Sequence, residues 1–480
     1  MSRFERPMPY DSLGDFLAVL QDTGDVVRVA VPVDAAEEIA AITSQVVSAH
    51  QDGGPVLIFA NVRNSSFPVV TNVLGNSRRI CKALGISHAN ELAQRWTDRG
   101  AASADARTGW LPRSSRQAPA QQVIRLGRDV NLFELPIPRH TGEANPVIHA
   151  GLLVLGDPHT GQRFLERVPV QVLDRARLAL HFPKYGSLAD RLPNSDRQWP
   201  AAIVLGGDPL HAVAAETRTW PQVPEGYAWE GCLRGKGIET ARCRSHDLEI
   251  PAHAEWVIEG FLHPAGLDAE PAWEEAPPVA LSGGRLGRGG RQPVVLVSAL
   301  THRANPLLPA TIWGASPQEE YWLRQTAEQM FLPQLQQSFP ELVDWHAPPF
   351  GRGEDVLFVS LRPQYPGHPR QLMHALWGHP RGKTAKFIVV VDAEVNVHQP
   401  DAVWSAVAAN VDAERDTVRV TGPAAADDFN ALNGLVGKIG IDATRKDSSA
   451  AIAAPPAELR QRLRERWTEL GLPPRWGETL

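Results

Sequence analysis

Apolar positions in the first part of the chain alternate between helical and extended spacing. Residues 11–29 open with a helical stripe preceded by Asp11 as a candidate N-cap, and its apolar positions are Leu13, Phe16, Leu17 and Leu20. A second stripe in residues 34–50 predicts another amphipathic helix, with an apolar face of Ile39, Ile42, Val46 and Val47. Short apolar runs such as VLIF, bounded by Gly, Pro and Asn, indicate strands. The alternation predicts an N-terminal α/β domain over residues 1–115.

The middle of the chain, residues 116–315, has strand-like segments separated by long connections and few helical stripes. The segments include GLLVLGD, AAIVLGGDP and QPVVLVSAL, and this texture favours a barrel or curled sheet. Helical stripes return around DVLFVSL and AKFIVVVD, so residues 316–480 are predicted to form a C-terminal α/β domain. The last predicted helix has an apolar stripe that requires a surface to cover, in this chain or in a partner subunit: Leu459, Leu463, Trp467 and Leu470.

Composition excludes several classes of function. The chain has 480 residues, 43% of them hydrophobic, which suits a globular protein of two or three domains. A formal net charge of -6 gives no general reason to expect nucleic-acid binding. Cys81, Cys232 and Cys243 form no CxxC, so neither a disulfide framework nor a structural zinc site is expected. No signal-peptide h-region or membrane-length apolar run is present, and we expect a cytoplasmic protein.

Motifs along almost the whole chain resemble, in order, those of the UbiD-type decarboxylases, which use prenylated FMN. They include GGPVLIFANV, EGCLRGKGIE, LEIPAHAEWVIEG, ALTHRANPLLP, KFIVVVDAEVNV and KIGIDATRK. The resemblance implies an α/β and α+β multidomain fold: an N-terminal α/β domain, a central split β-barrel of the flavin-reductase type, and a C-terminal α/β oligomerisation domain. It also implies non-oxidative, reversible decarboxylation of an aromatic or α,β-unsaturated carboxylic acid. A UbiX-type flavin prenyltransferase would supply the cofactor, and the chain would form a homodimer or a higher homo-oligomer.

Acidic residues crowd in AEPAWEE (residues 269–275) without a basic neighbour. Composition alone favours a solvated acidic loop. The family has paired glutamates five residues apart, and Glu270 and Glu275 match that spacing. The resemblance therefore implies that Glu275 is the proton donor and that Glu270 supports it. A buried carboxyl group near another carboxylate has a raised pKa, which a proton donor at neutral pH requires.

The segment FLERVPVQVLD departs from the family pattern at two chemical positions. Its register with the family puts Phe164 where a metal-binding asparagine belongs and Pro169 where the catalytic arginine belongs. Arg167 lies two residues before Pro169, on the same face of a strand, and its long side chain is the candidate substitute. The alternative is that Arg167 is a solvated strand residue.

Local motifs assign the remaining positions by resemblance. Lys386 matches a lysine near the cofactor, the alternative being a solvated lysine at a strand end. Glu225 and Glu230 both match the glutamate ligand of a divalent cation such as Mn²⁺, and Glu230 is preferred; K⁺ is a further implied ion. His149, where the family often has threonine, is interpreted as a structural histidine, the alternative being a residue that lines the pocket. His181 is interpreted as a packed or partly exposed histidine rather than a metal ligand.

Two functions are compatible with these motifs. The first is a prenylated-FMN decarboxylase with an altered site, which the retained spacing of Glu270 and Glu275 favours. The second is a degenerate, non-catalytic subunit or binding protein that acts as partner of a complete UbiD-type enzyme, which Phe164 and Pro169 favour. We expect the decarboxylase, because the loss of a ligand is easier to compensate than a whole fold is to imitate.

Overall fold

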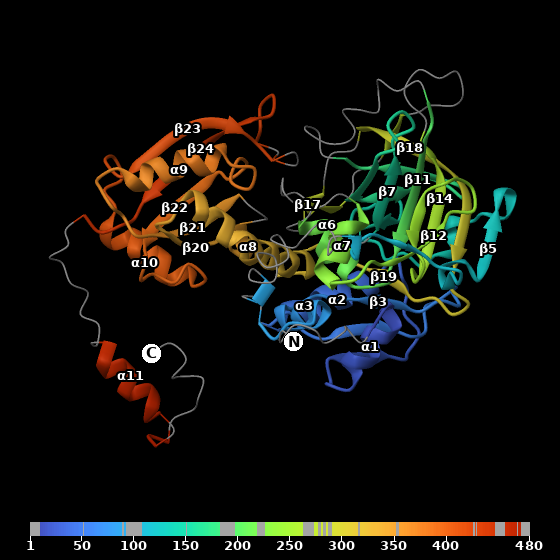
Figure 1. Cartoon of the computed structure of the whole chain (residues 1–480), viewed down its shortest axis with the longest axis horizontal. Helices are drawn as coiled ribbons and strands as arrows, with labels where there is room; N and C mark the ends of the chain where they lie inside the picture. The colour runs from blue at the N-terminus through green and yellow to red at the C-terminus, as the bar shows by residue number, and fades with distance from the viewer. Residues whose placement is uncertain are drawn as a thin grey trace.

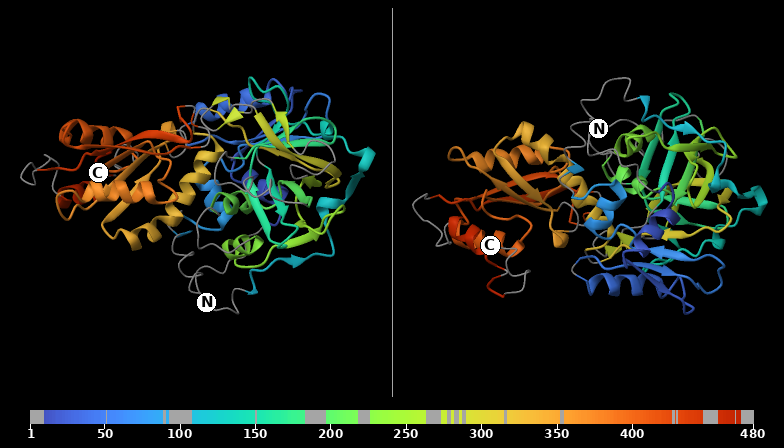
Figure 2. Two further views of the ribbon diagram at one scale, coloured as in Figure 1. Left: turned by 90° about the horizontal axis from the view of Figure 1, so that it is seen from above. Right: turned by 60° about the horizontal axis from the view of Figure 1, so that its bottom comes forward.

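The chain folds into two lobes (Figure 1). The N-terminal and central domains form one lobe, and the helix α8 (Glu319–Ser338) connects them to the C-terminal sheet, which stands apart in both further views (Figure 2). The computed structural model describes residues 10–50, 52–88, 91–92, 108–149, 151–182, 197–217, 226–262, 273–276, 280–281, 285–286, 290–314, 317–351, 355–425, 428, 430–446, 457–467 and 469–471.

The N-terminal domain is a small sheet packed with helices. Its strand order is β1-β2-β3-β19, so that a strand from after the central domain, β19 (Leu308–Ala310), pairs with β3. The other elements are α1 (Leu13–Gln21), β1 (Val26–Val29), α2 (Ile39–Ser48), β2 (Val56–Phe59), β3 (Val69–Thr71) and α3 (Ser77–Leu84). The return of β19 brings segments that are distant in sequence to one wall of the molecule.

The first two predicted helices form, with two corrections. The four apolar positions of α1 are buried, but its N-cap is Ser12 rather than Asp11, because the Ser12 side chain accepts a hydrogen bond from the Asp15 backbone N–H. Helix α2 begins at Ile39, and its fully buried residues are Ile39, Ala40, Thr43 and Val47. Thr43 faces inward because its hydroxyl group lies 2.9 Å from that of Thr71 in a buried hydrogen bond.

The central domain is built on a curled, ten-stranded sheet, which confirms the predicted fold class. Its main path is β6-β9-β10-β18-β14-β11-β7-β8, and β5 and β15 also pair with β18. The strands are β5 (Val123–Leu126), β6 (Val147–Ile148), β7 (Leu152–Gly156), β8 (Arg163–Arg167), β9 (Val170–Val172), β10 (Arg177–Leu180), β11 (Trp199–Leu205), β14 (Trp256–Leu262), β15 (Trp273–Ala276) and β18 (Gly290–His302).

Smaller elements complete this domain. Their bounds are β4 (Arg113–Ser114), β12 (Glu239–Arg242), β13 (Glu249–Pro251), β16 (Ala280–Leu281), β17 (Arg285–Leu286), α6 (Leu210–Thr217), α7 (Tyr227–Arg234) and three 3₁₀ turns, η1 (Pro119–Gln121), η2 (Gly127–Asp129) and η3 (Leu132–Glu134).

Each central strand presents alternate residues to two different cores. On β7, Leu153 and Leu155 pack in the cluster on the concave side of the sheet, whereas Leu152 and Val154 pack with Leu165 of β8 in the other cluster. Tyr227 at the start of α7 belongs to this second cluster, so α7 covers that face. Because side chains alternate along β8, the end of the strand directs Arg167 to the same face as Leu165.

The C-terminal domain is a five-stranded sheet in the order β20-β21-β22-β24-β23. Its elements are β20 (Leu342–His346), η6 (Pro349–Gly351), β21 (Val356–Leu361), α9 (His368–Gly378), β22 (Phe387–Asp392), α10 (Pro400–Asn410), β23 (Thr417–Pro423), β24 (Leu435–Asp442) and α11 (Ala457–Glu465). Leu459 and Leu470 remain exposed, so the described residues leave this stripe open to a partner.

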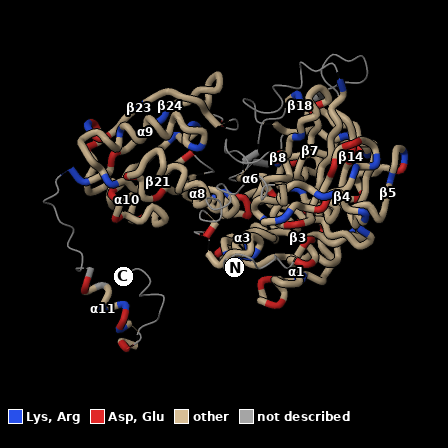
Figure 3. The backbone as a smooth tube through the Cα atoms, viewed as in Figure 1, with Lys and Arg blue, Asp and Glu red and all other residues tan. Residues whose placement is uncertain are grey.

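Charged residues of both signs occur over both lobes. Figure 3 shows Lys and Arg interspersed with Asp and Glu over both lobes. Among the described residues, every helix is too short or too polar to cross a lipid bilayer.

Candidate functional site

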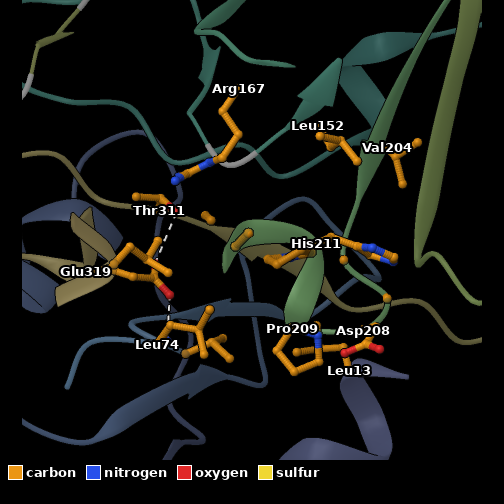
Figure 4. A pocket seen from close by; sticks show the side chains of 17 residues that line it. Leu13, Leu74, Leu152, Arg167, Val204, Asp208, Pro209, His211, Thr311 and Glu319 are labelled. Carbon is orange, nitrogen blue, oxygen red and sulfur yellow. Dashed lines mark hydrogen bonds between the residues drawn. The ribbon is translucent and has the colours of Figure 1, made fainter. Parts of the chain in front are cut away.

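A cavity of about 80 Å³ lies where the N-terminal domain, the central sheet and α8 meet (Figure 4). Leu13 and Leu74 line it from the N-terminal domain, Leu152 and Arg167 from the sheet, and Glu319 from α8. Its walls are mainly apolar, with a few charged groups, which is typical of ligand sites. The volume has room for a few water molecules or a small acidic group, and is below the several hundred Å³ that a drug-sized ligand occupies.

Arg167 is the cationic residue of this cavity. Its side chain is 13% exposed and points into the cavity towards Thr311 (Figure 4). Its one ion-pair partner among the described residues is Glu216 of α6, at 4.0 Å, and its buried Nε–H has no hydrogen-bond partner there. Arg167 is therefore not a solvated strand residue, because its side chain is largely buried. Its guanidinium group keeps a donor for a ligand.

Glu319 holds together the wall of the cavity opposite Arg167. Its Oε1 accepts a hydrogen bond from the Leu74 backbone N–H at 2.6 Å, and its Oε2 accepts one from the Thr311 hydroxyl group at 3.1 Å. The carboxylate lies in the first turn of α8, where the helix dipole favours negative charge. One buried side chain thus connects β3, β19 and α8 at the edge of the cavity.

A buried ionic network supports the third side. Asp208 pairs with Arg234 of α7 at 2.5 Å, and His211 Nδ1 lies 2.7 Å from Glu230 Oε2. Burial raises the pKa of Asp208, although Arg234 and His211 oppose this effect. Burial acts to lower the pKa of His211, but Glu230 and Asp208 outweigh it, and the pKa is raised. The carboxylates around His211 therefore favour its protonated form.

Three side chains form a hydrogen-bonded chain next to Arg167. The Trp313 backbone N–H donates to His140 Nε2 at 2.8 Å, so the His140 proton resides on Nδ1, 3.3 Å from Glu143 Oε2. Glu143 Oε1 lies 3.1 Å from His149 Nε2. Burial acts to raise the pKa of Glu143, but the hydrogen bonds from both histidines outweigh it and hold the pKa well below its usual range. The ionised carboxylate accepts from His149 Nε2, which leaves Nδ1 of His149 as an acceptor.

His149 is neutral at physiological pH. Burial lowers its pKa to about 4, and the charge of Arg167 acts in the same direction while Glu143 opposes it. His149 is packed, as predicted, but it is not fully hydrogen-bonded. The ring lies 4.5 Å from that of Trp313, tilted by 38°, and its Nε2 is hydrogen-bonded to Glu143, but its buried Nδ1 has no partner among the described residues. His181 is packed as expected, with Nε2 lying 3.1 Å from Gln171 Oε1.

Four buried polar atoms in this region lack hydrogen-bond partners in the described structure. They are one acceptor and three donors: His149 Nδ1, Arg167 Nε, Gln171 Nε2 and Trp313 Nε1. Gln171 belongs to the same group because Val147 of β6 pairs with it on β9. Unpaired buried polar atoms are costly, and they indicate a ligand or bound water. The polar edge of a flavin ring, with carbonyl acceptors and one N–H donor, would supply the partners that these donors and this acceptor lack.

The other predicted site residues are not brought together by the described structure. Glu270 lies outside the described residues, and Glu275 is described only as a backbone position of β15, paired with Arg291. Lys386 forms ion pairs with Asp355 at 3.0 Å and Asp428 at 2.9 Å within the C-terminal domain. Their site roles stay predictions.

Two positions that concern the predicted metal site, Phe164 and Glu230, are described. Phe164 packs against the concave-side core, 6.2 Å from the ring of Trp199. Glu225 lies outside the described residues, and Glu230 is engaged by His211. In the described part of the chain, Glu230 belongs to neither of the two groups of side chains that could hold a metal ion. The Mn²⁺ site stays a prediction, and Phe164 has no side-chain oxygen to offer it.

Sequence reasoning missed Glu143, Asp208 and Glu319. Their burial was the missing information, since each carboxylate is at most 8% exposed. One signal was available: RHTGEANPVIH puts two histidines around a single glutamate in a segment otherwise rich in turn residues.

Family models match most of the chain. The N-terminal, Rift-related and C-terminal domains of 3-octaprenyl-4-hydroxybenzoate carboxy-lyase (UbiD) match residues 17–96, 112–316 and 321–443. The histidine chain falls within the Rift-related region, and the cavity-lining residues fall within the three regions except for Leu13 and Glu319.

Solved structures show the same architecture. The UbiD-class enzyme HmfF from Pelotomaculum thermopropionicum, in complex with FMN, is 28% identical with a TM-score of 0.80, over 94% of this chain and 98% of that chain. An evolved dimeric form of HmfF in complex with prFMN is 26% identical, with a TM-score of 0.75 over 93% of this chain and 98% of that chain. The vanillic acid decarboxylase of Sedimentibacter hydroxybenzoicus in open form has the same fold, at 23% identity and a TM-score of 0.82, over 96% of this chain and 99% of that chain.

Proposed function

Because this chain belongs to the UbiD family of carboxy-lyases, we propose that it catalyses the reversible, non-oxidative decarboxylation of an aromatic or α,β-unsaturated carboxylic acid with prenylated FMN. The observation that carries the proposal is the set of unpaired buried polar atoms beside Arg167. They supply the donors and the acceptor that a flavin ring and an acidic substrate require.

Arg167 is the proposed substrate-orienting cation. Its guanidinium group can donate charge-assisted hydrogen bonds to a carboxylate, and its one described anionic neighbour, Glu216, is at 4.0 Å. The low exposure of Arg167 strengthens this attraction, since little water competes for the same donors. Pro169, at the position of the family arginine, has no polar side chain, and its backbone carbonyl accepts a hydrogen bond from the His181 N–H.

Glu275 is the proposed proton donor, with Glu270 beside it. When bound, the cofactor supplies the electron sink that stabilises the carbanion equivalent as CO₂ leaves. The protein then delivers one proton to that carbon, and a carboxylic acid with a raised pKa suits this role. β15 pairs with β18, which anchors the backbone of Glu275 to the central sheet.

His149, Gln171 and Trp313 are the proposed flavin-binding residues. The neutral His149 ring offers Nδ1 as an acceptor, and Glu143 fixes its orientation through Nε2. Gln171 and Trp313 offer donors. Lys386 remains a candidate cofactor contact from the C-terminal domain. No step is assigned to a divalent cation or to K⁺.

A second candidate is a non-catalytic subunit that binds a complete UbiD-type enzyme. The packing of Phe164 in the concave-side core favours it, because no oxygen ligand can occupy that position. Exposed Leu459 of α11 and Leu470 after it would provide a contact for such a partner or for a second copy of this chain.

The test is to co-express the full chain with a UbiX-type flavin prenyltransferase, purify it, and record its absorption spectrum. We expect bound modified flavin in about one equivalent, and CO₂ release from at least one acid in a panel of aromatic and α,β-unsaturated acids. A colourless protein without turnover overturns the proposal. A stable complex with a complete UbiD-type enzyme, whose activity then depends on this chain, supports the second candidate.

A further inference from the structure

A second cluster of polar side chains lies on the central sheet outside the cavity of Figure 4. Cys243 follows β12, His246 lies in the turn between β12 and β13, and Glu259 lies on β14. One potential ligand atom from each lies within 4.8 Å of the other two. The Cys243 N–H donates to the Leu248 carbonyl at 2.8 Å, which closes the turn over Glu259. None of the three residues lines the cavity.

The ring of His246 presents a free lone pair to the cluster. Its Nε2 lies 3.0 Å from the Ala201 carbonyl oxygen, which can only accept, so the proton resides on Nε2. Its Nδ1 is therefore an acceptor, and it is buried without a partner among the described residues. Metal-binding histidines usually donate their second N–H to a carbonyl or carboxylate in this way, which fixes the tautomer and the ring orientation.

Glu259 adds a buried oxygen that also lacks a partner. The residue is 0% exposed. Its Oε2 accepts from the backbone N–H groups of Arg244 and Ser245 and from the Ser245 hydroxyl group, at 2.7, 2.8 and 2.9 Å. Its Oε1 has no hydrogen-bond partner, and the residue forms no ion pair with a described lysine or arginine. A buried carboxylate oxygen without a partner is costly, and a cation would remove that cost.

The histidine tautomers distinguish this cluster from the histidine chain near Arg167. At His140, the Trp313 N–H occupies Nε2 and the proton on Nδ1 points at Glu143, so no lone pair faces the carboxylate. At the β12–β13 turn, the imidazole nitrogen and the carboxylate oxygen are both unpartnered, and Cys243 contributes a buried free thiol. Only the second arrangement offers three donors without breaking an existing hydrogen bond.

We propose that Cys243, His246 and Glu259 bind one Zn²⁺ ion. Sulfur, imidazole nitrogen and carboxylate oxygen are ligands that zinc accepts together, in tetrahedral geometry with a fourth position for water. Binding requires the thiol to release its proton to solvent, and the thiolate and carboxylate then balance the charge of the ion. The ion would fasten the β12–β13 turn to β14. The expectation of no zinc site rested on cysteine spacing, which does not detect a Cys-x-x-His pair joined by a distant glutamate.

The test uses the full-length protein, stripped with a chelator and titrated with Zn²⁺ and separately with Co²⁺. We expect about one Zn²⁺ per chain and, with Co²⁺, a near-ultraviolet sulfur-to-cobalt charge-transfer band that only thiolate ligation produces. Cys243→Ser should abolish the band, and His246→Gln should weaken binding more than the roughly 10–100-fold that loss of an outer-shell partner costs. Cys81→Ser and Cys232→Ser are matched controls that should leave it intact.

The readout is independent of flavin binding and of decarboxylation. A metal held by oxygen ligands near the flavin would give no sulfur band. If Cys243→Ser does not fold, the Zn²⁺ and Co²⁺ titrations of the wild-type protein test the proposal by themselves. Failure of the wild-type protein to bind one equivalent of either ion, or a charge-transfer band that persists in Cys243→Ser, overturns the proposal.

Discussion

Replacing Glu319 by alanine should open the wall of the cavity where three domains meet. Its carboxylate accepts hydrogen bonds from the Leu74 N–H and the Thr311 hydroxyl group, at 2.6 and 3.1 Å, and the residue is 8% exposed. Each hydrogen bond to a charged group contributes about 1.5–3 kcal/mol. The local free energy of opening should therefore fall by about 3 kcal/mol or more, which is over a hundredfold in the opening equilibrium.

Hydrogen–deuterium exchange measured by mass spectrometry can test this prediction. Peptides that contain Leu74 or Thr311 should exchange about a hundredfold faster in Glu319→Ala if local opening governs their exchange. The neighbouring Glu320 is a matched control. It pairs with Arg324 at 2.9 Å one turn along α8, and i,i+4 helix pairs contribute about 0.3–0.5 kcal/mol. Equal exchange at Leu74 in Glu319→Ala and Glu320→Ala would refute the proposed wall.

Three further predictions concern buried ionisable groups. Burial raises the pKa of Glu255 to about 7, so the folded chain holds this proton more tightly than the unfolded chain does. The free energy of unfolding, measured in urea, should therefore fall by about 3 kcal/mol as pH rises from 4.5 to 7, and Glu255→Gln should flatten that dependence. Arg234→Met should lower the free energy of unfolding by about 3–5 kcal/mol, because it leaves Asp208 buried without its cation. Lys236→Met, at the exposed pair with Asp11, should lower it by under about 1 kcal/mol in the same assay. His149→Phe keeps a ring against Trp313 but removes the acceptor, and should weaken FMN binding by about three- to tenfold in a fluorescence titration; an unchanged affinity contradicts its flavin-binding role.

The fold was predictable because periodicity reports burial along a single element. The helical stripe of residues 11–29 and the buried runs of the C-terminal sheet specify their own inward faces, and motif order supplied the domain arrangement. The errors were local. The N-cap moved by one residue to Ser12. The inward face of α2 also includes Thr43, whose hydroxyl group forms a hydrogen bond with that of Thr71, while Ile42 packs against the core as a partly buried residue.

The site was less predictable because its walls come from segments that are distant in sequence. Leu74, Thr311 and Glu319 meet through pairing of β3 with β19, which no local pattern announces. The tautomer of His149 depends on a chain of hydrogen bonds that runs through Glu143 and His140 to the backbone N–H of Trp313. Residue spacing in the sequence does not reveal such a chain. The resemblance identified Arg167 as the candidate cation, and the structure supplied its burial.

The central claim is that Arg167 performs the work of the arginine replaced at Pro169. Arg163 is a matched control on the same strand, since it pairs with Glu249 at 2.7 Å and is 37% exposed. The most direct measurement is the rate of CO₂ release by prenylated-FMN-loaded wild-type, Arg167→Ala and Arg163→Ala proteins at equal flavin content. The account predicts a rate reduced by about 10²-fold in Arg167→Ala and unchanged within about twofold in Arg163→Ala. Wild-type turnover in Arg167→Ala, or no turnover by the flavin-loaded wild-type protein, would contradict it.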